Sequence, residues 1–182
     1  MDNKNSCCFT GHRLIPPELV GNIIRTLDLE IRWLFSHGVD TFYTGGALGF
    51  DLLAARSVIS ARNEGLPIKL IIAVPCPDQD RGYPRWDRSE YRLQLAQADQ
   101  VIRVSEFYFK GCMLVRDRYM VDRSAYCVCW LTEKSGGTAY TVSYAKKRGC
   151  QVINLADLPP DDDDLGRDFE GKSEQINLEQ VE

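Results

Sequence analysis

The feature that most constrains the fold of this chain is the alternation of short apolar runs with longer stretches of helical periodicity. The run at residues 70–74 is apolar at every position, which is typical of a strand covered on both faces. Strands and helices that alternate at this spacing form a mostly parallel sheet joined by right-handed crossovers. The sequence therefore predicts an α/β fold, with a mostly parallel sheet and helices on both of its faces.

Six strands and five helices are expected, and the chain begins with a strand. The apolar runs predict strands at residues 7–10, 41–44, 70–74, 101–104, 126–131 and 152–155. Helical periodicity predicts helices at about 17–37, 47–63, 91–96, 113–124 and 139–147. At 182 residues and 44% apolar composition, the chain can bury the core of one domain.

Charge divides the chain into two parts. Residues 160–182 carry nine acidic and two basic side chains, a net charge of −7, whereas the whole chain carries −4 and the remainder therefore +3. This mild positive charge suits a protein that handles a small anion better than one that binds DNA by charge. We assign residues 1–158 to one folded domain. We expect residues 159–182 to form an acidic, disordered tail, because so polar a segment cannot offset its ordering entropy.

The cysteines favour a reducing compartment. Seven are present, and their spacing matches neither a disulfide framework nor a CxxC zinc site. Those at residues 7–8 and at 127 and 129 lie in predicted strands, where reduced core residues are the simplest interpretation. No apolar run is long enough to span a membrane, and we expect no leader segment. We therefore expect a cytoplasmic protein with no membrane partner, no metal site and no resident cofactor.

Three predicted strands end in turns of small residues: Thr10-Gly11, Thr44-Gly45-Gly46 and Ser135-Gly136-Gly137-Thr138. Ligands of parallel sheets bind beyond the carboxyl ends of the strands, so we expect these turns to lie together. Glycines leave backbone N–H groups free to face an anion, and a helix that begins at Ala47 adds its positive dipole end. The glycine spacing departs from the G-x-G-x-x-G and P-loop fingerprints. The alternative is that the glycines permit close packing between strand and helix.

Charged side chains near these turns complete the predicted site. The planar guanidinium of Arg116 can hold a phosphate through two hydrogen bonds; the alternative is a solvated stripe that pairs with Asp117 and Asp122. Arg13 adds either a second cationic contact or a salt bridge at the rim. Asp51 is a candidate for binding a ribose hydroxyl, or for a favourable interaction with the helix dipole. The predicted ligand-binding residues are Gly11, Arg13, Thr44, Gly45, Gly46, Gly49, Asp51, Arg116, Gly136, Gly137 and Thr138.

The turns and the segment that carries Arg116 together resemble a known superfamily. The matching segments are residues 9–13 (FTGHR), 44–51 (TGGALGFD), 116–122 (RDRYMVD) and 136–138 (GGT), within residues 7–155. In order and spacing they are similar to the SMF/DprA-LOG (SLOG) superfamily and, within it, to the YpsA-like family of unknown function. The resemblance implies a Rossmann-like SLOG domain at residues 1–158. It also implies a nucleotide or nucleotide-derived ligand, of the ADP-ribose, NAD or nucleoside monophosphate kind.

The same resemblance raises an enzymatic alternative. LOG enzymes hydrolyse the base–ribose bond of nucleoside monophosphates with an arginine and a glutamate, and residues 113–116 are similar to their M-x-x-R motif, which would make Arg116 catalytic. Ser143 stands at the position of their glutamate. An oxocarbenium-like transition state needs a nearby carboxylate, which Asp51 or Asp122 would have to supply.

We therefore predict a cytoplasmic sensor that binds a nucleotide-type small molecule through glycine-rich loops at the carboxyl ends of the strands. An N-glycosidic phosphoribohydrolase is the alternative. Single-stranded DNA binding, as in the DprA branch, is less favoured because the charge of the core is modest, so nucleic acid is not expected as a partner. Related folds often pair through helices, and a homodimer is expected by analogy.

Overall fold

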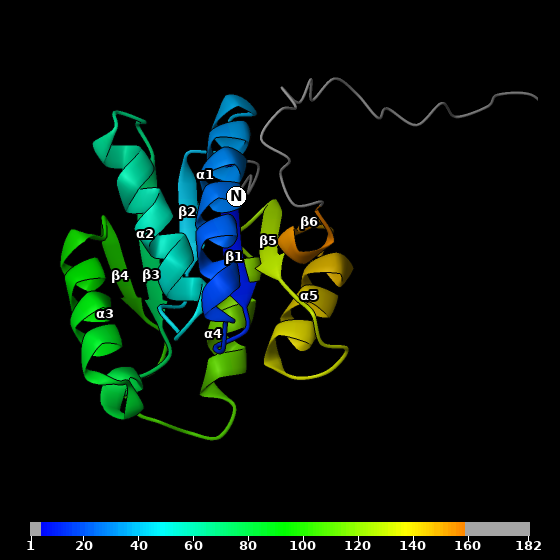
Figure 1. The fold of residues 1–182 in the computed structure, drawn as a ribbon. Helices are drawn as coiled ribbons and strands as arrows, with labels where there is room; N and C mark the ends of the chain where they lie inside the picture. Colours follow the sequence, from blue (N-terminus) through cyan, green and yellow to red (C-terminus); the bar gives the residue numbers. More distant parts are fainter. Residues whose placement is uncertain (1–4, 159–182) are drawn as a thin grey trace, which may run out of the picture.

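The computed structural model describes residues 5–158 and contains one six-stranded sheet with helices on both faces (Figure 1). The strands are β1 (Ser6–Gly11), β2 (Thr41–Thr44), β3 (Lys69–Val74), β4 (Gln100–Arg103), β5 (Tyr126–Trp130) and β6 (Gln151–Asn154). The helices are α1 (Pro17–Ser36), α2 (Phe50–Asn63), α3 (Arg85–Gln97), α4 (Cys112–Val121) and α5 (Gly137–Lys147). All the strand pairs are parallel, so the predicted fold class is confirmed. The acidic segment 159–182 lies outside the described residues.

The strand order, β4-β3-β2-β1-β5-β6, contains one reversal. The chain steps outward from β1 to β4 and then returns to place β5 on the other side of β1. These two strands are in register, with Cys8 opposite Cys127 and Gly11 opposite Trp130. Ligands of open α/β sheets bind beyond the carboxyl ends of the strands at such a reversal. The topology therefore indicates a ligand site near Gly11 and the residues that follow Trp130.

One face of the sheet is covered by α1 and α2 and holds the larger core. Phe9 of β1 and Phe42 of β2 stack with ring centroids 5.9 Å apart, and Phe9 also contacts Phe50 of α2 edge-on, within the same cluster. Complete burial of a large apolar side chain contributes about 1.5–3 kcal/mol. Helix α1 adds four buried apolar residues at helical spacing, Ile23, Leu27, Ile31 and Leu34.

The opposite face, under α4 and α5, is built from small residues. Cys8, Ala73 and Cys127 of the sheet pack with Met120 of α4 and Ala145 of α5, and all five are almost fully buried. Small side chains on the strands allow both helices to lie close to the sheet. The seven cysteines all fall within the described residues and are buried and unpaired. No described helix is both long enough and apolar enough to cross a membrane.

The start of α2 differs from the prediction for a physical reason. The helix begins at Phe50 rather than at Ala47, because Gly49 adopts a φ of 76°. The amide of Phe50 donates to the carbonyl of His12 at 3.1 Å. A side chain at Gly49 would overlap the main-chain carbonyls of His12 and Arg13. Gly49 therefore allows the loop after β1 to pack directly against the start of α2.

Candidate ligand-binding site

A cavity of about 340 Å³ opens at the carboxyl ends of β1 and β5, at the reversal of the sheet. Its walls come from the loop after β1, the segment that leads into α2, and the first turns of α4 and α5. Six of the eleven ligand-binding residues predicted from the sequence share this cavity, whereas Thr44, Gly45, Gly46, Gly49 and Gly136 do not line it. The lining residues are Thr10, Gly11, His12, Arg13, Ala47, Asp51, Met113, Leu114, Arg116, Asp117, Gly137 and Thr138.

The turn after β2, where the sequence predicts free amides, is filled by the protein itself. The amides of Gly45 and Ala47 donate to Oδ2 of Asp51 at 3.0 and 3.4 Å. The hydroxyl of Thr44 donates to the main-chain carbonyl of Asp51 at 3.1 Å. The expectation that these amides face an external anion is therefore wrong, because the Asp51 carboxylate is the anion that they hold.

Protein atoms also explain why two residues of this turn lack side chains. A Cβ on Gly45 would overlap the guanidinium of Arg116. Gly46 has a φ of 61°, and a Cβ there would stand 2.7 Å from the ring of Tyr91. At both positions the close-packing interpretation that the sequence left open describes the structure.

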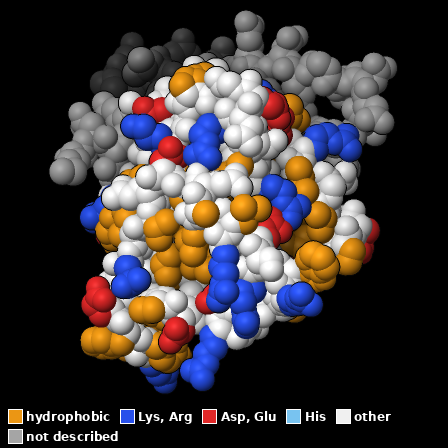
Figure 2. Space-filling model, turned by 90° about the vertical axis from the view of Figure 1, so that its left-hand side faces the viewer, with side chains coloured by type: hydrophobic (Ala, Val, Ile, Leu, Met, Phe, Trp, Pro, Cys, Tyr) orange, Lys and Arg blue, Asp and Glu red, His pale blue; other side chains and the backbone are white. Residues whose placement is uncertain are grey.

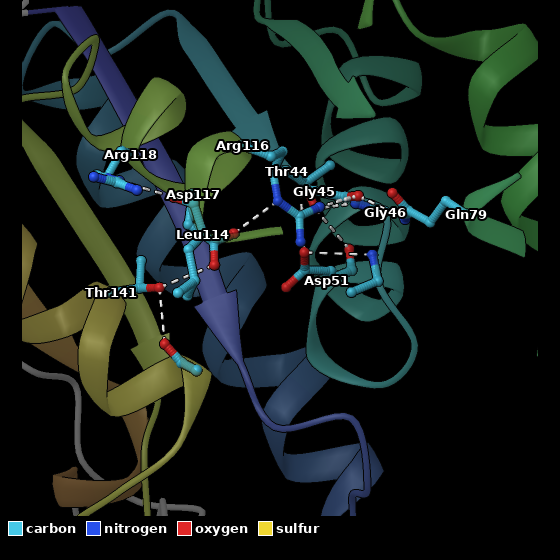
Figure 3. Close-up of polar contacts among 12 residues, drawn as sticks. Thr44, Gly45, Gly46, Asp51, Gln79, Leu114, Arg116, Asp117, Arg118 and Thr141 are labelled. Atoms are coloured by element: carbon cyan, nitrogen blue, oxygen red, sulfur yellow. Dashed lines mark hydrogen bonds and ion pairs between the residues drawn. The ribbon is translucent and has the colours of Figure 1, made fainter. Parts of the chain in front are cut away.

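Arg116 is the centre of a buried charge network (Figure 3). The residue is 4% exposed, its Nε donates to Oδ1 of Asp117 at 2.7 Å, and its Nη1 donates to the carbonyl of Gly45. The hydroxyl of Thr141 on α5 donates to Oδ2 of Asp117 at 3.1 Å. Figure 3 shows the guanidinium between the carboxylates of Asp51 and Asp117. Arg116 is thus a buried cation and not part of a solvated stripe.

Sequence reasoning missed Asp117 and Thr141 as residues of the site. The sequence offered Asp117 only as a partner of Arg116 in a solvated stripe, because neighbouring positions on a helix normally point in different directions and give no reason to expect a buried pair. Thr141 lies four positions after Gly137, one helical turn along, and shares its face of α5. That spacing was the available signal for Thr141.

The network gives its part of the cavity a net negative charge. Burial, and to a smaller extent the charge of Asp117, raise the pKa of Asp51 from 3.8 to about 6, against the lowering effect of Arg116. Burial lowers the pKa of Arg116, but the charges of Asp117 and Asp51 outweigh it, so the pKa is raised and the guanidinium stays charged. The carboxyl groups of Asp51 and Asp117 therefore face one charged guanidinium. Such a wall repels anions and favours hydrogen-bond donors such as hydroxyl groups.

The first turn of α5 forms a second, donor-rich wall. The first amides of a helix have no partner within the helix, and α5 begins at Gly137 after Gly136, whose φ is 100°. A Cβ on either glycine would meet nothing within 4 Å, so the space beside them is open. Arg13 lines the same cavity, and none of the ion pairs among residues 5–158 involves it. This wall suits an anion.

The carboxylates of the cavity come from Asp51 and Asp117, and α5 supplies none. Ser143, where the resemblance would place a catalytic glutamate, is exposed and does not line the cavity. Asp122 also lies outside the lining and pairs with Arg148 at 2.8 Å. Within residues 5–158, no group of three or more His, Cys, Asp or Glu side chains is arranged to hold a metal ion.

Two solved structures of DNA processing protein A have a similar fold. That of Helicobacter pylori, a structure concerned with its single-stranded DNA binding mode, has a TM-score of 0.60 and 23% identity, and the match covers 83% of this chain and 65% of that one. That of Streptococcus pneumoniae has a TM-score of 0.59 and 18% identity, over 81% of this chain and 48% of that one. This chain corresponds to part of each neighbour, and at such identities the likeness shows the fold alone.

Sequence relatives match over a large part of the chain. The SPbeta prophage-derived protein YoqJ of Bacillus subtilis is 32% identical over 118 residues, which cover 58% of this chain and 69% of that protein. The UPF0398 protein BH1768 of Halalkalibacterium halodurans is 29% identical over 129 residues, which cover 69% and 68%. A sequence model of the YspA SLOG family matches residues 17–157. The predicted resemblance is confirmed, and the chain belongs to the YspA SLOG family.

Proposed function

We propose that this chain is a cytoplasmic binding protein, acting as a sensor, for a nucleotide or a derivative such as a nucleoside monophosphate, ADP-ribose or NAD. The observation that carries the proposal is that one cavity has both a net negative wall, formed by Asp51, Arg116 and Asp117, and a donor-rich wall at the start of α5. A nucleotide has matching chemistry, because its ribose offers hydroxyl donors and its phosphate offers acceptors. The unpaired cysteines support a reducing compartment.

The phosphate is assigned to the first turn of α5 and to Arg13. A helix N-terminus contributes about 0.3–1 kcal/mol to an exposed anion, and a hydrogen bond from a charged group such as Arg13 contributes about 1.5–3 kcal/mol. Micromolar binding requires about 8 kcal/mol, so the phosphate contacts alone are too weak. The sugar and the base must therefore contribute the rest of the binding energy.

The ribose hydroxyls are assigned to the carboxylates of Asp51 and Asp117. The sequence predicts that Arg116 grips the phosphate, but its Nε and Nη1 are already engaged by Asp117 and Gly45. The net negative charge around it also opposes an approaching phosphate. We therefore assign to Arg116 the role of fixing the two carboxylates, and its direct contact with a ligand stays a prediction.

Thermal unfolding with AMP, ADP-ribose, NAD and cyclic nucleotides tests the proposal. A ligand present at 100 times its Kd is expected to stabilise the fold by about 2.7 kcal/mol. Arg13→Ala should weaken that effect and leave the free protein unchanged, because Arg13 is exposed. The matched control is Lys147→Ala, an exposed cation in the last turn of α5. Absence of any stabilisation, or equal effects of the two substitutions, would contradict the proposal.

A second candidate function is hydrolysis of the N-glycosidic bond, which the two carboxylates in the cavity favour. A pKa of about 6 brings Asp51 towards the range in which a carboxyl group works as a general acid or base near neutral pH. Incubation with AMP and chromatographic detection of adenine and ribose 5-phosphate separate the two functions. Adenine release that Asp51→Asn abolishes supports hydrolysis, whereas binding without release supports the sensor.

Single-stranded DNA is a third ligand class, suggested by the fold shared with the Helicobacter pylori protein. DNA binding by charge weakens steeply as the salt concentration rises, because counterions are released from the strand. Titration of a fluorescent oligonucleotide at low and high salt tests this class. Binding that is tighter than that of AMP and strongly salt-dependent favours DNA over a mononucleotide.

A further inference from the structure

The loop between β4 and α4 exposes three consecutive aromatic side chains, defined here as the aromatic loop, residues 107–109. Phe107 and Tyr108 are each 70% exposed, and Phe109 is 39% exposed. Adjacent apolar rings in water are unfavourable and mark a surface that becomes covered when something binds. Figure 2 views the molecule from the side of α3 and β4 and shows hydrophobic and basic side chains interspersed on that face.

The aromatic loop leads directly into α4, the helix that carries cavity-lining residues. The hydroxyl of Ser105 donates to the carbonyl of Phe107 at 2.7 Å, which fixes the turn that presents the rings. The carbonyl of Phe109 accepts from the amide of Cys112, the first residue of α4, at 3.0 Å. The next residue, Met113, lines the cavity. The loop therefore adjoins the cavity through the first turn of α4.

The charges near the aromatic loop favour a nucleotide. Lys110 is exposed and is in none of the ion pairs formed between described residues. Glu106, the only acidic residue between 104 and 111, is paired with Arg103 at 3.6 Å. Exposed aromatic rings beside an available cation are the combination on which proteins stack bases while they hold the adjoining phosphates.

We propose that the aromatic loop is a base-binding subsite, on which a purine or pyrimidine stacks while the attached sugar phosphate occupies the cavity. This inference rests on the proposed function and adds to it the specificity for a base. The shared chemistry is a base joined to a sugar phosphate, supplied either as a free nucleotide or within a single strand. A sugar phosphate without a base gains nothing from the loop.

Calorimetric titrations with ribose 5-phosphate, AMP and a ten-residue oligo(dA) test the subsite. The protein is expected to bind AMP about 5- to 150-fold more tightly than ribose 5-phosphate, because one stacked base contributes that much to the affinity. The double variant Phe107→Ala/Tyr108→Ala should lose this preference and keep its affinity for ribose 5-phosphate. Both rings are exposed, so the fold should be retained. The control, Trp86→Ala, removes a ring that is 86% exposed on α3 and should change none of the affinities.

Each outcome of these titrations decides something. Equal affinities for AMP and ribose 5-phosphate, or an unchanged AMP affinity in the double variant, overturn the inference and leave the proposed function standing. Failure of all three compounds to bind overturns both. Loop-dependent binding supports the inference. If oligo(dA) then binds more tightly than AMP, the base comes from a single strand, and if it does not, the base belongs to a free nucleotide.

Discussion

Two glycine-containing turns leave the same edge of the sheet and differ in what occupies the space beside them. After β2, Gly45 lies against the guanidinium of Arg116, and its amide is held by Asp51. After β5, the positions of a Cβ on Gly136 and Gly137 have no heavy atom within 4 Å. The first turn is filled by the protein, and the second is open. A missing side chain in a strand-to-helix turn therefore has two physical causes, and only one of them leaves room for a ligand.

The filled turn still shapes the site, because it carries its own anion. Backbone amides that gather around a point make a concave anion-binding surface, and here the carboxylate of Asp51 occupies it. That carboxylate is held near Asp117, with Arg116 between them (Figure 3). The open turn offers amides to an anion from outside. One cavity thus combines an anion site that Asp51 already occupies with an open one at the start of α5. In our proposal the phosphate of the ligand therefore lies at α5 and its ribose lies at the carboxylates.

The substitution Arg116→Ala tests the filled turn after β2, and we expect it to have the largest effect on stability. The substitution leaves the carboxylates of Asp51 and Asp117 buried without the cation between them. Removal of one partner from a buried charge network costs about 3–5 kcal/mol. Urea unfolding at pH 7 measures this loss in the free energy of unfolding.

Two further variants sharpen that result. Arg118→Ala removes an exposed arginine of α4, whose Nε donates to the carbonyl of Leu114 at 3.3 Å, and should change stability by no more than about 0.5 kcal/mol. Addition of Asp51→Asn to Arg116→Ala should restore part of the lost stability, because one uncompensated charge is removed. Equal costs for the two arginines would show that the network does not hold the filled turn together.

Because the Asp51 carboxyl group is buried in the filled turn, we also predict that the free energy of unfolding changes by about 3 kcal/mol with pH. Because the pKa of Asp51 is raised from 3.8 to about 6, the folded protein retains a proton that the unfolded chain releases between these values. The contribution of Asp51 to the free energy of unfolding is therefore largest below about pH 4 and falls as the pH rises to above about 6. Relative to Asp51→Asn, the wild-type protein should lose stability over this range in urea unfolding. A stability difference that stays constant with pH would argue against a carboxylate whose ionised form is destabilised by burial.

The order of the elements could be predicted from the sequence because each depends on local periodicity. Every strand lies within one or two residues of its predicted range. The start of α2 could not be predicted, because the φ of Gly49 is required by its contact with the main chain at residues 12–13, which lie far away in the sequence. Local patterns thus predict where helices and strands form, whereas tertiary contacts determine the residues at which they begin and end.

The site could be predicted only in outline. Gly11 and Gly137 were expected together because the carboxyl ends of parallel strands share an edge, and both line the cavity, as does Arg116 of α4. The sequence offered Asp51 two roles, at a ribose or at the helix dipole, whereas the structure shows it binding the amides of its own turn. The exposure of residues 107–109 could not be predicted either, since a run of aromatic residues is equally compatible with a core.

The most direct comparison of the two turns is a pair of identical substitutions, Gly45→Ala and Gly137→Ala. A methyl group on Gly45 displaces the guanidinium of Arg116 from a packed interior, and urea unfolding should show a loss of about 1–3 kcal/mol. A methyl group on Gly137 enters open space at the start of α5 and should change stability by no more than about 0.5 kcal/mol. Gly137→Ala should weaken AMP binding more than Gly45→Ala does, because the methyl on Gly137 occupies space through which a phosphate would approach the helix amides. A destabilised Gly137→Ala with intact AMP binding would mean that the open turn serves packing, as its counterpart after β2 does.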